Sequence, residues 1–475
     1  MTYKPTFFQT IWKIHKNIYE KLGVWRALSI FSCKLKDYIC SGVALWPHNQ
    51  NLNVMIVKSF VLRRESFNEI VGQCVPGTID VVRPEKALEN MIRTIVDKMV
   101  TRKQNVREEI AAVSAYLDGV SSDAAYRQKK DEFLQYVEDY LRSAAGYSVS
   151  MDLVEDYVLA QCAFLCAQAV ADAAGLEVMD GRELVVCHQE GVFDWTATGK
   201  RIVQKCRDRS GLVVSGGYAR TILGMVLRIG KGGANMMASL LGSALGAELI
   251  EFYVEGDGIN GISAMTYDEA AHYCARSAAP FPSAALWPAK KAGIPIVVRS
   301  ISKPGLPGTG ITASGAAPDG SNVSGIIADK NLDLVTVYGT GLLGQVGASS
   351  SIFSSLAKAG INIRFISQTS SEYAISFAVD AKDRDKVISV IDSLITENPL
   401  MPMDDVVMLN REVGIVTVYG SRMKNIPGVS GKVFSTLGEA GVNVIAAAQG
   451  GEELSISVVL DVNDVDKAAK ALAKL

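Results

Sequence analysis

The stretch "TVYGTGLLGQVGASSSIFSSLAKAGINIRFISQTSSEYAISFAVD", residues 336–380, recurs 81 positions later as "TVYGSRMKNIPGVSGKVFSTLGEAGVNVIAAAQGGEELSISVVLD", residues 417–461. The two stretches align without a gap. Matching positions run through the whole alignment and pair Thr336 with Thr417, Phe353 with Phe434, Asn362 with Asn443, Gln368 with Gln449, and Asp380 with Asp461. An internal repeat of this kind predicts two copies of one structural unit.

Each copy has the same order of patterns. A strand-like run and a glycine-bearing loop come first, then an amphipathic helix, then two further strand-like runs. Gly360 and Gly441 follow the helices, where glycine most easily takes the left-handed conformation. Charged helical patterns follow at 381–395 and 462–475. We therefore predict two βαββα modules of roughly 60 residues, each too small to stand alone and expected to pair sheet to sheet.

Upstream of the repeats, short apolar runs alternate with helical patterns. This alternation predicts a mainly parallel sheet covered by helices on both faces, with ligands at the carboxyl ends of its strands. The runs interpreted as strands are "NLNVMIVKSF" (51–60), "EEIAAVSAYL" (108–117), "GLVVSGGY" (211–218), "AELIEFYVEGDG" (247–258) and "GIPIVVRS" (293–300). The clearest helical patterns are "DYVLAQCAFLCAQAVADAAG" (156–175) and "GANMMASLLGSALGA" (233–247).

Composition narrows the classes of function. The 475 residues include 48 Lys and Arg against 50 Asp and Glu, a balance that argues against a nucleic-acid partner. No apolar run reaches the roughly 18 residues of a membrane span, so no membrane partner is expected. The eight cysteines form no CxxC pair and the four histidines no HExxH, which favours a cytoplasmic protein with reduced thiols and no protein-held metal.

The first fifty residues contain "FFQTIWKIHKNIYEKLGVW" (7–25), with aromatic residues near helical spacing and lysines between them. A packed helix, a targeting extension for an organelle and a membrane-surface helix all remain open for this segment. The expected organisation is an extension at 1–50, a sheet domain at 51–310, a Gly- and Pro-rich linker at 311–330, and repeats at 331–400 and 401–475.

Together these parts resemble an aspartokinase, in which an amino-acid-kinase domain precedes tandem ACT domains. The resemblance rests on "AGLEVMDGRELVV" (174–186), "GAELIEFYVEGDG" (246–258), "MTYDEAAHYC" (265–274) and "AKKAGIPIVVRSISKPGLPGT" (289–309). In the repeats, "ISQTSSEYAISFAV" (366–379) and "AAAQGGEELSISVVL" (446–460) resemble threonine-sensitive members. The resemblance implies phosphoryl transfer from ATP to L-aspartate, yielding ADP and 4-phospho-L-aspartate, with Mg²⁺ and no tightly bound cofactor.

The resemblance also implies where nucleotide and phosphate would bind. The catalytic candidates are Lys58, in "VKSFVLRRESF" (57–67), and Lys231, in the glycine loop "VLRIGKGGANMMASLLGSALGA" (226–247). The ATP-binding candidates are Gly230, Gly232, Gly233, Asp257 and Gly258.

Several family motifs are altered. The loop carries Ala234 and Asn235 where the family has a serine and an aspartate, and Asn235 cannot balance a metal or a lysine. The Gly-Glu-Arg motif expected near residue 162 is Cys162, Ala163 and Phe164, and "AAPFPSAA" (278–285) lacks the family's lysine, histidine and arginine. Because the structural patterns survive while reactive positions change, we expect impaired or absent turnover.

The repeats retain their candidate effector contacts. By resemblance, Gln368 and Gln449 contact threonine, and Asn362 and Asn443 are further candidates. An amide both donates and accepts hydrogen bonds, which suits an amino-acid effector such as threonine or lysine. Three functions remain open: an allosteric aspartokinase, an inactive sensor that pairs with an active aspartokinase, or an amino-acid kinase with a different acyl acceptor. In each case we expect oligomers formed through the ACT domains.

Overall fold

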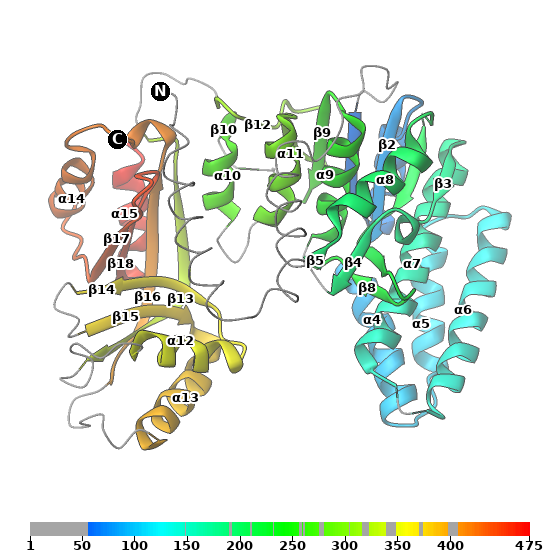
Figure 1. Ribbon diagram of the computed structural model, residues 1–475, viewed down its shortest axis with the longest axis horizontal. Coiled ribbons are helices and arrows are strands. Elements are labelled where there is room, and N and C mark those ends of the chain that lie inside the picture. The colour runs from blue at the N-terminus through cyan, green and yellow to red at the C-terminus, as the bar shows by residue number, and fades with distance from the viewer. Residues whose placement is uncertain are drawn as a thin grey trace, which may run out of the picture.

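The computed structural model describes residues 56–475 except 148, 190–191, 210, 231, 256–258, 260–261, 275–279, 304, 316–322, 339–347, 370–373 and 398–406. The expected N-terminal helix at 7–25 therefore lies outside the described residues. Figure 1 shows a sheet domain (residues 56–315) beside a repeat domain (residues 323–475), with α10 (Tyr267–Cys274) between them.

The centre of the sheet domain is a mainly parallel sheet. Eight described strands follow the order β10-β12-β11-β9-β1-β2-β6-β3, and only the pair β11 and β12 is antiparallel. The predicted sheet class is thus confirmed. The strands are β1 (Ile56–Leu62), β2 (Thr78–Pro84), β3 (Glu177–Met179), β6 (Leu212–Ser215), β9 (Leu249–Val254), β10 (Ala264–Thr266), β11 (Ile296–Ser300) and β12 (Thr309–Thr312).

Helices cover both faces of this sheet because its strands carry apolar side chains on both sides. One apolar cluster joins the sheet to α8, α9, α10 and α11. A second cluster joins it to α3, α4 and α7 and extends to α5 and α6, which form the outer layer of this side (Figure 1). The remaining helices are α3 (Phe67–Gln73), α4 (Lys86–Val96), α5 (Arg107–Asp118), α6 (Ala124–Ala144), α7 (Met151–Ala174), α8 (Trp195–Cys206), α9 (Gly233–Leu245) and α11 (Leu286–Ala292).

Two helices of this domain, α5 and α7, differ from what the sequence analysis expected. "EEIAAVSAYL", interpreted as a strand, lies in α5; its Glu and Ala residues favour a helix, and Val113 and Leu117 are buried four positions apart. Among the described residues, α7 alone is long and apolar enough to cross a bilayer. It packs against β2 and β6, with Leu159 and Cys166 fully buried, as a core helix does.

A smaller sheet lies beside the main one. Four described strands follow the order β5-β4-β7-β8. Their bounds are β4 (Val186–Gln189), β5 (Val192–Phe193), β7 (Tyr218–Thr221) and β8 (Val226–Arg228). Because β8 ends two residues before Gly230, this small sheet positions the glycine loop at the start of α9.

The repeat domain confirms the two βαββα modules. Its six described strands form one antiparallel sheet, β14-β15-β13-β16-β18-β17. The first module contains β13 (Gly325–Tyr338), α12 (Ala348–Lys358), β14 (Ile363–Gln368), β15 (Ala374–Asp380) and α13 (Arg384–Glu397). The second contains β16 (Val407–Tyr419), α14 (Val429–Glu439), β17 (Ala446–Gln449), β18 (Ser455–Asp461) and α15 (Val465–Leu472).

The long first strands of the modules hold the pair together. β13 pairs with β16 through 325–329 and again at 332 and 334–337, and it pairs with β15 through 332–338. Each long strand has a residue with positive φ at the matching position, Asn331 in β13 and Glu412 in β16. The repeat symmetry extends to side chains, because Thr336 bonds Ser376 and Thr417 bonds Ser457, each at 2.9 Å. Gly360 and Gly441 are left-handed, as predicted.

The junction between the domains centres on Glu269 of α10, whose exposed fraction is 2%. Its carboxylate accepts hydrogen bonds from the Thr266 amide at 2.6 Å, from Ser324 Oγ at 2.5 Å and from the Ser421 amide at 2.6 Å. Burial raises the pKa of Glu269, but these hydrogen bonds outweigh burial and lower it below its ordinary value. An ionised carboxylate thus joins the sheet domain to the start of β13 and to the second repeat.

The expected linker contains structured segments. β12 ends at Thr312 inside the main sheet, and β13 begins at Gly325 inside the repeat sheet. Tyr419 of β16 is fully buried in the apolar cluster of the sheet domain. The two domains are therefore packed against each other, and the described connection is shorter than the composition at 311–330 suggested.

Candidate functional site

A cavity of about 520 Å³ opens at the carboxyl ends of the central strands. Such ends are where ligands bind in open α/β sheets. The lining comes from β1, β2, α4, the turn before β7, β8, the glycine loop, the start of α9 and a segment before α11. The lining residues are Val61, Arg83, Lys86, Glu89, Asn90, Arg93, Gly217, Tyr218, Arg228, Gly230, Gly232, Ala234, Asn235, Pro280, Phe281 and Pro282.

The glycine loop forms one wall of this cavity. Gly230 and Gly232 have φ of 109° and 66°, a region that side-chain-bearing residues rarely adopt. A Cβ atom at Gly232 would overlap the ring of Pro282, and one at Gly233 would overlap Gly217. Gly230 and Gly232 therefore line the cavity, while Gly233 packs beneath it. Lys231, Asp257 and Gly258 lie outside the described residues.

Asn235 fills the position expected for an acid. Its Oδ1 accepts a hydrogen bond at 2.8 Å from Ser59 Oγ of β1, and both side chains are buried. Ala234 beside it is buried and apolar. This corner of the cavity is thus a closed, neutral pair that carries neither a carboxylate nor an ammonium group.

Lys58 does not line the cavity. Strand side chains alternate between faces, and Ser59 and Val61 point toward α9 and the cavity, so Lys58 lies on the opposite face with Phe60. Its side chain is 6% exposed, and Nζ donates to the Gln73 carbonyl at 2.5 Å. The catalytic role expected for Lys58 is not supported by this geometry.

Lys58 instead belongs to a buried row of charges under α3. Register places it between Asp80 of β2 and Glu251 of β9, and Glu251 binds Arg299 at 2.6 Å. Burial raises the pKa of Asp80 to about 7, although Thr78 and Lys58 lower it. The row lies toward the amino ends of the strands, away from the cavity.

Sequence reasoning missed the charged residues that do line the cavity. Arg83 is the penultimate residue of β2 and Glu89 lies in the first turn of α4, with 4.0 Å between guanidinium and carboxylate. Arg83, in "VVRPEK" (81–86), directly follows the buried apolar residues of β2, and that position was the available signal.

Two further arginines of the cavity form ion pairs with carboxylates of α7. Arg228 binds Asp156 at 2.7 Å and Arg93 binds Glu155 at 3.3 Å. Glu155 and Asp156, in the first turns of α7, therefore each pair with an arginine of the cavity. Burial raises the pKa of Asp156 despite the opposing effect of Arg228.

The α7 positions aligned with the Gly-Glu-Arg motif contribute no polar group. Cys162 and Ala163 are buried in the apolar cluster between α7 and the sheet. Hydrogen bonding to Cys166 and burial raise the pKa of the Cys162 thiol well above its ordinary value, so it stays protonated. Polar recognition at this cavity comes from β2, α4 and β8 instead.

The candidate effector residues lie in the repeat domain. Gln368 and Gln449 end β14 and β17, and both are exposed. Gln449 Oε1 accepts a hydrogen bond from Ser430 Oγ at 3.0 Å. Asn362 and Asn443 are exposed between the helices and these strands. In each module the Asn precedes and the Gln ends the same strand, β14 in the first module and β17 in the second.

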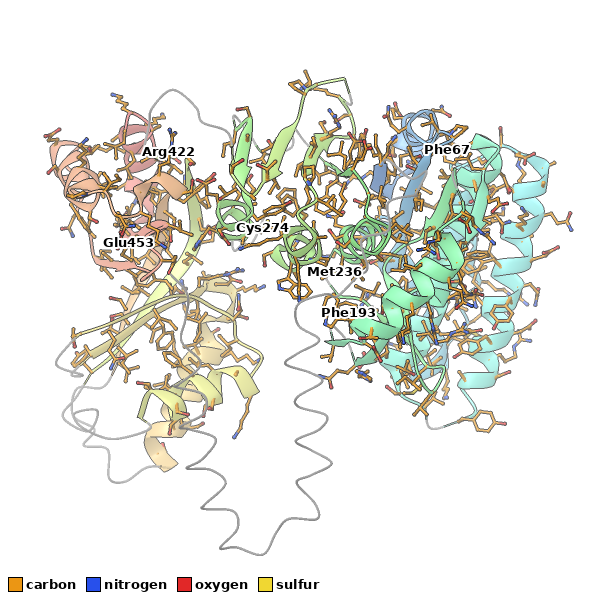
Figure 2. All side chains as sticks on the ribbon, turned by 45° about the horizontal axis from the view of Figure 1, so that its top comes forward. Phe67, Phe193, Met236, Cys274, Arg422 and Glu453 are labelled. Atoms are coloured by element: carbon orange, nitrogen blue, oxygen red, sulfur yellow. The ribbon has the colours of Figure 1, made fainter. Side chains whose placement is uncertain are left out.

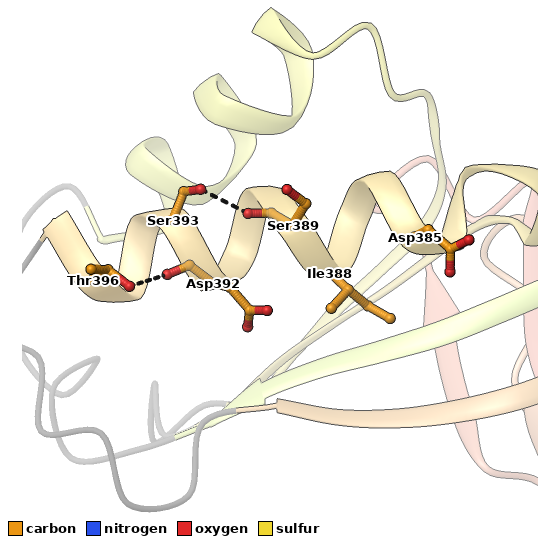
Figure 3. Close-up of a pocket in the computed structure, with 6 residues that line it drawn as sticks. All are labelled: Asp385, Ile388, Ser389, Asp392, Ser393 and Thr396. Carbon is orange, nitrogen blue, oxygen red and sulfur yellow. Dashed lines mark hydrogen bonds between the residues drawn. The ribbon is translucent and has the colours of Figure 1, made fainter.

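Two other grooves lie outside the cavity of the sheet domain. The outer face of α13 has a groove lined by Asp385, Ile388 and Asp392, in which Ser393 and Thr396 donate to their own helix at 2.9 and 2.8 Å (Figure 3). A second groove, lined by residues that include His272 and Glu452, lies between α10 and the second repeat. Figure 2 shows Cys274, at the end of α10, between Met236 and the repeat residues Arg422 and Glu453.

Comparison with known proteins identifies the family of the two repeats. The ACT domain family matches residues 335–393 and 416–475, so the repeat domain is a tandem ACT pair. The bifunctional aspartokinase/homoserine dehydrogenase of Haemophilus influenzae is 29% identical over 275 residues, covering 55% of this chain and 33% of that protein. A chloroplastic bifunctional aspartokinase/homoserine dehydrogenase of Zea mays is 26% identical over 438 residues, covering 85% of this chain and 48% of that protein.

Solved structures agree with the fold of the whole chain. Clostridium acetobutylicum aspartate kinase superposes with a TM-score of 0.72 at 19% identity, covering 88% of this chain and 99% of that one. Escherichia coli aspartokinase III, in complex with lysine and aspartate, gives a TM-score of 0.73 at 16% identity, covering 89% and 99%.

The sheet domain and the tandem repeats together have the fold of the solved aspartate kinases, and the repeats match the ACT domain family. The chain is an aspartokinase homologue with a tandem ACT pair. It spans between a third and a half of the length of the first curated relatives that it matches.

Proposed function

We propose that this chain is an amino-acid-binding regulatory member of the aspartokinase family whose own phosphoryl transfer to L-aspartate is lost or strongly reduced. The observation that carries this proposal is the hydrogen bond from Ser59 to Asn235. Phosphoryl transfer needs cations that hold the phosphates and acids that organise them or their metal. A neutral hydroxyl–amide pair at the base of the glycine loop supplies neither.

The described residues do not fit a magnesium–nucleotide pair. Among the described residues that line the cavity, Glu89 is the one carboxylate, and it lies 4.0 Å from Arg83. Mg²⁺ prefers carboxylate and phosphate oxygens in octahedral geometry, and one acid beside a guanidinium does not provide such a site. We therefore derive no step through ATP or Mg²⁺.

What the residues can do is bind. The glycine loop places backbone N–H groups at the start of α9, a helix of 13 residues, and such a terminus attracts anions. The ACT pair keeps Gln368 and Gln449 at equivalent, exposed positions. We propose that threonine or lysine is the effector; the E. coli structure with bound lysine supports an amino acid of this group. The same proposal places the protein in the cytoplasm or, through residues 1–50, in an organelle.

A second candidate is a working aspartokinase with relocated chemistry. It is favoured by the retained glycine loop and by Arg83, a cation at the end of β2. In both candidates we propose that ACT domains assemble the chain into oligomers, with itself or with an active aspartokinase.

Two measurements separate these candidates. Aspartyl hydroxamate formation with ATP and L-aspartate detects transfer, and the regulatory proposal expects none above the protein-free background. Calorimetry with threonine and with lysine detects the effector, and Gln368→Ala and Gln449→Ala should each weaken binding. Turnover at rates usual for enzymes, or calorimetric heats that neither glutamine variant changes, would contradict the proposal.

A further inference from the structure

The hairpin between β7 and β8 ends in an exposed apolar turn. Leu223 is 86% exposed, more than any other large apolar side chain among the described residues, and Ile222 is 68% exposed. Backbone hydrogen bonds close the turn: the Thr221 amide donates to the Met225 carbonyl at 2.8 Å, and the Gly224 amide donates to the Thr221 carbonyl at 3.0 Å. A hydrogen-bonded turn thus holds two aliphatic side chains in water, and the hydrophobic effect favours a surface that covers them.

Strand register adds Met225 and Val192 to this surface. Both side chains are 42% exposed. β4 lies between β5 and β7, with Cys187 opposite Thr221 and Gln189 opposite Val192. Because β4 and β7 are parallel, Val192 lies at the same end of the small sheet as the turn. We define the tip patch as Val192, Ile222, Leu223 and Met225.

The size of the tip patch argues against a stable contact between two molecules. Four such side chains expose a few hundred Å² at most, whereas a stable interface buries roughly 800 Å² on each partner. A segment of the same chain needs less area, because its tether supplies a high effective concentration and docking costs little translational freedom. The size therefore favours an occupant from within the chain.

The chain supplies such a segment before its first described strand. Fifty-five residues precede Ile56, the start of β1. The pattern at 7–25 spaces Phe8, Trp12 and further apolar residues as one face of a helix, with lysines between them, and such a face needs an apolar surface to cover it. Residues 26–55 can span up to about 100 Å, which exceeds the diameter of roughly 50 Å expected for a domain the size of the sheet domain. The segment can therefore reach the tip patch.

We propose that the apolar face of residues 7–25 docks on the tip patch of the same chain. Its aromatic side chains cover Leu223 and Ile222, and its lysines stay in water. Because β8 ends two residues before Gly230, docking also restrains the hairpin that carries the glycine loop. This inference is independent of the proposed function, which concerns phosphoryl transfer and effector binding.

Hydrogen–deuterium exchange on the full chain tests the docking. The first variant is Leu223→Asp; because Leu223 is exposed, the change leaves the fold intact, which circular dichroism checks. Leu306→Asp is the matched control, since it makes the same change at another exposed leucine, between β11 and β12. The double variant Phe8→Ser, Trp12→Ser is the reciprocal test, because it alters the segment and leaves the hairpin unchanged. Light scattering records the oligomeric state of each protein.

The expected effects are reciprocal. In the wild type, peptides from 7–25 are protected. Leu223→Asp raises their exchange rate by about tenfold or more, because a carboxylate replaces the apolar contact and resists burial. The double variant raises exchange of peptides from 218–228. Leu306→Asp changes neither, and all variants keep the oligomeric state of the wild type, since the contact lies within one chain.

Other results overturn the proposal. It fails if peptides from 7–25 exchange as fast in the wild type as in the urea-unfolded chain, or if Leu223→Asp has no more effect on them than Leu306→Asp. A lower oligomeric state of Leu223→Asp would assign the tip patch to a second copy of the chain instead. Binding of the wild type, but not of Leu223→Asp, to phosphatidylglycerol vesicles would assign it to a membrane surface.

Discussion

Replacing Glu269 by glutamine should loosen the contact between the sheet domain and the ACT pair. The carboxylate uses both oxygens: Oε1 accepts from Ser324 and Ser421, and Oε2 accepts from Thr266. An amide has one acceptor oxygen, so at least one buried donor loses its partner, and the remaining bonds lose charge assistance. These losses sum to about 2–4 kcal/mol.

Urea unfolding followed by circular dichroism measures the loss of stability. Hydrogen–deuterium exchange of peptides that contain Ser421 measures the contact directly, and protection there should fall about 30-fold or more. Asp268→Asn is the matched control, because it removes the same charge from the neighbouring residue of α10, whose side chain is about half exposed. The exposed ion pair of Asp268 with Lys290 should contribute less than about 1 kcal/mol to the free energy of unfolding.

The pH dependence supplies a second check. Folding lowers the pKa of Glu269, so its stabilisation is present above the ordinary glutamate pKa of about 4.5 and is lost as pH falls through the lowered value. Glu269→Gln should flatten this acid-side loss. The reasoning is refuted if Glu269→Gln matches Asp268→Asn in stability and leaves exchange at Ser421 unchanged.

Other predictions concern the sheet domain and the second repeat. Burial raises the pKa of Asp80 to about 7, so its stabilisation is full below about pH 3.8 and is lost as pH rises through 7. Asp80→Asn should flatten the decline of the thermal midpoint between pH 5 and 8, and an unchanged slope would contradict this. Gly232→Ala should destabilise by more than about 1 kcal/mol, since its φ is 66° and Pro282 blocks a Cβ. Gly431→Ala, in α14 with no atom near its Cβ, should stabilise by about 0.5 kcal/mol, and denaturant midpoints should move in opposite directions for the two glycine variants.

Local patterns predicted much of the fold. The repeat alignment led to both βαββα modules, and Gly360 and Gly441 marked the helix ends. The pairing of β13 with β16 could not be predicted, because hydrogen bonding between two strands 81 residues apart leaves no periodic signal. α5 was misassigned as a strand because a short apolar run with two β-branched residues fits both the helical and the strand periodicity.

The candidate site was less predictable for a physical reason. In a strand, a shift of one residue moves a side chain to the other face, so the alignment that named Lys58 could not show that Ser59 faces the cavity. The Arg83–Glu89 and Glu269 contacts depend on tertiary placement, and Glu269 meets Ser421 across 152 positions. Such contacts between distant residues are visible only in the folded chain.

The measurement that tests the account most directly is aspartyl hydroxamate formation by the wild-type chain, with ATP and L-aspartate both in large excess over the protein. The account predicts no product above background, because Ser59 and Asn235 supply neither the cation nor the acid that transfer needs. Sustained product formation that scales with protein concentration would contradict it.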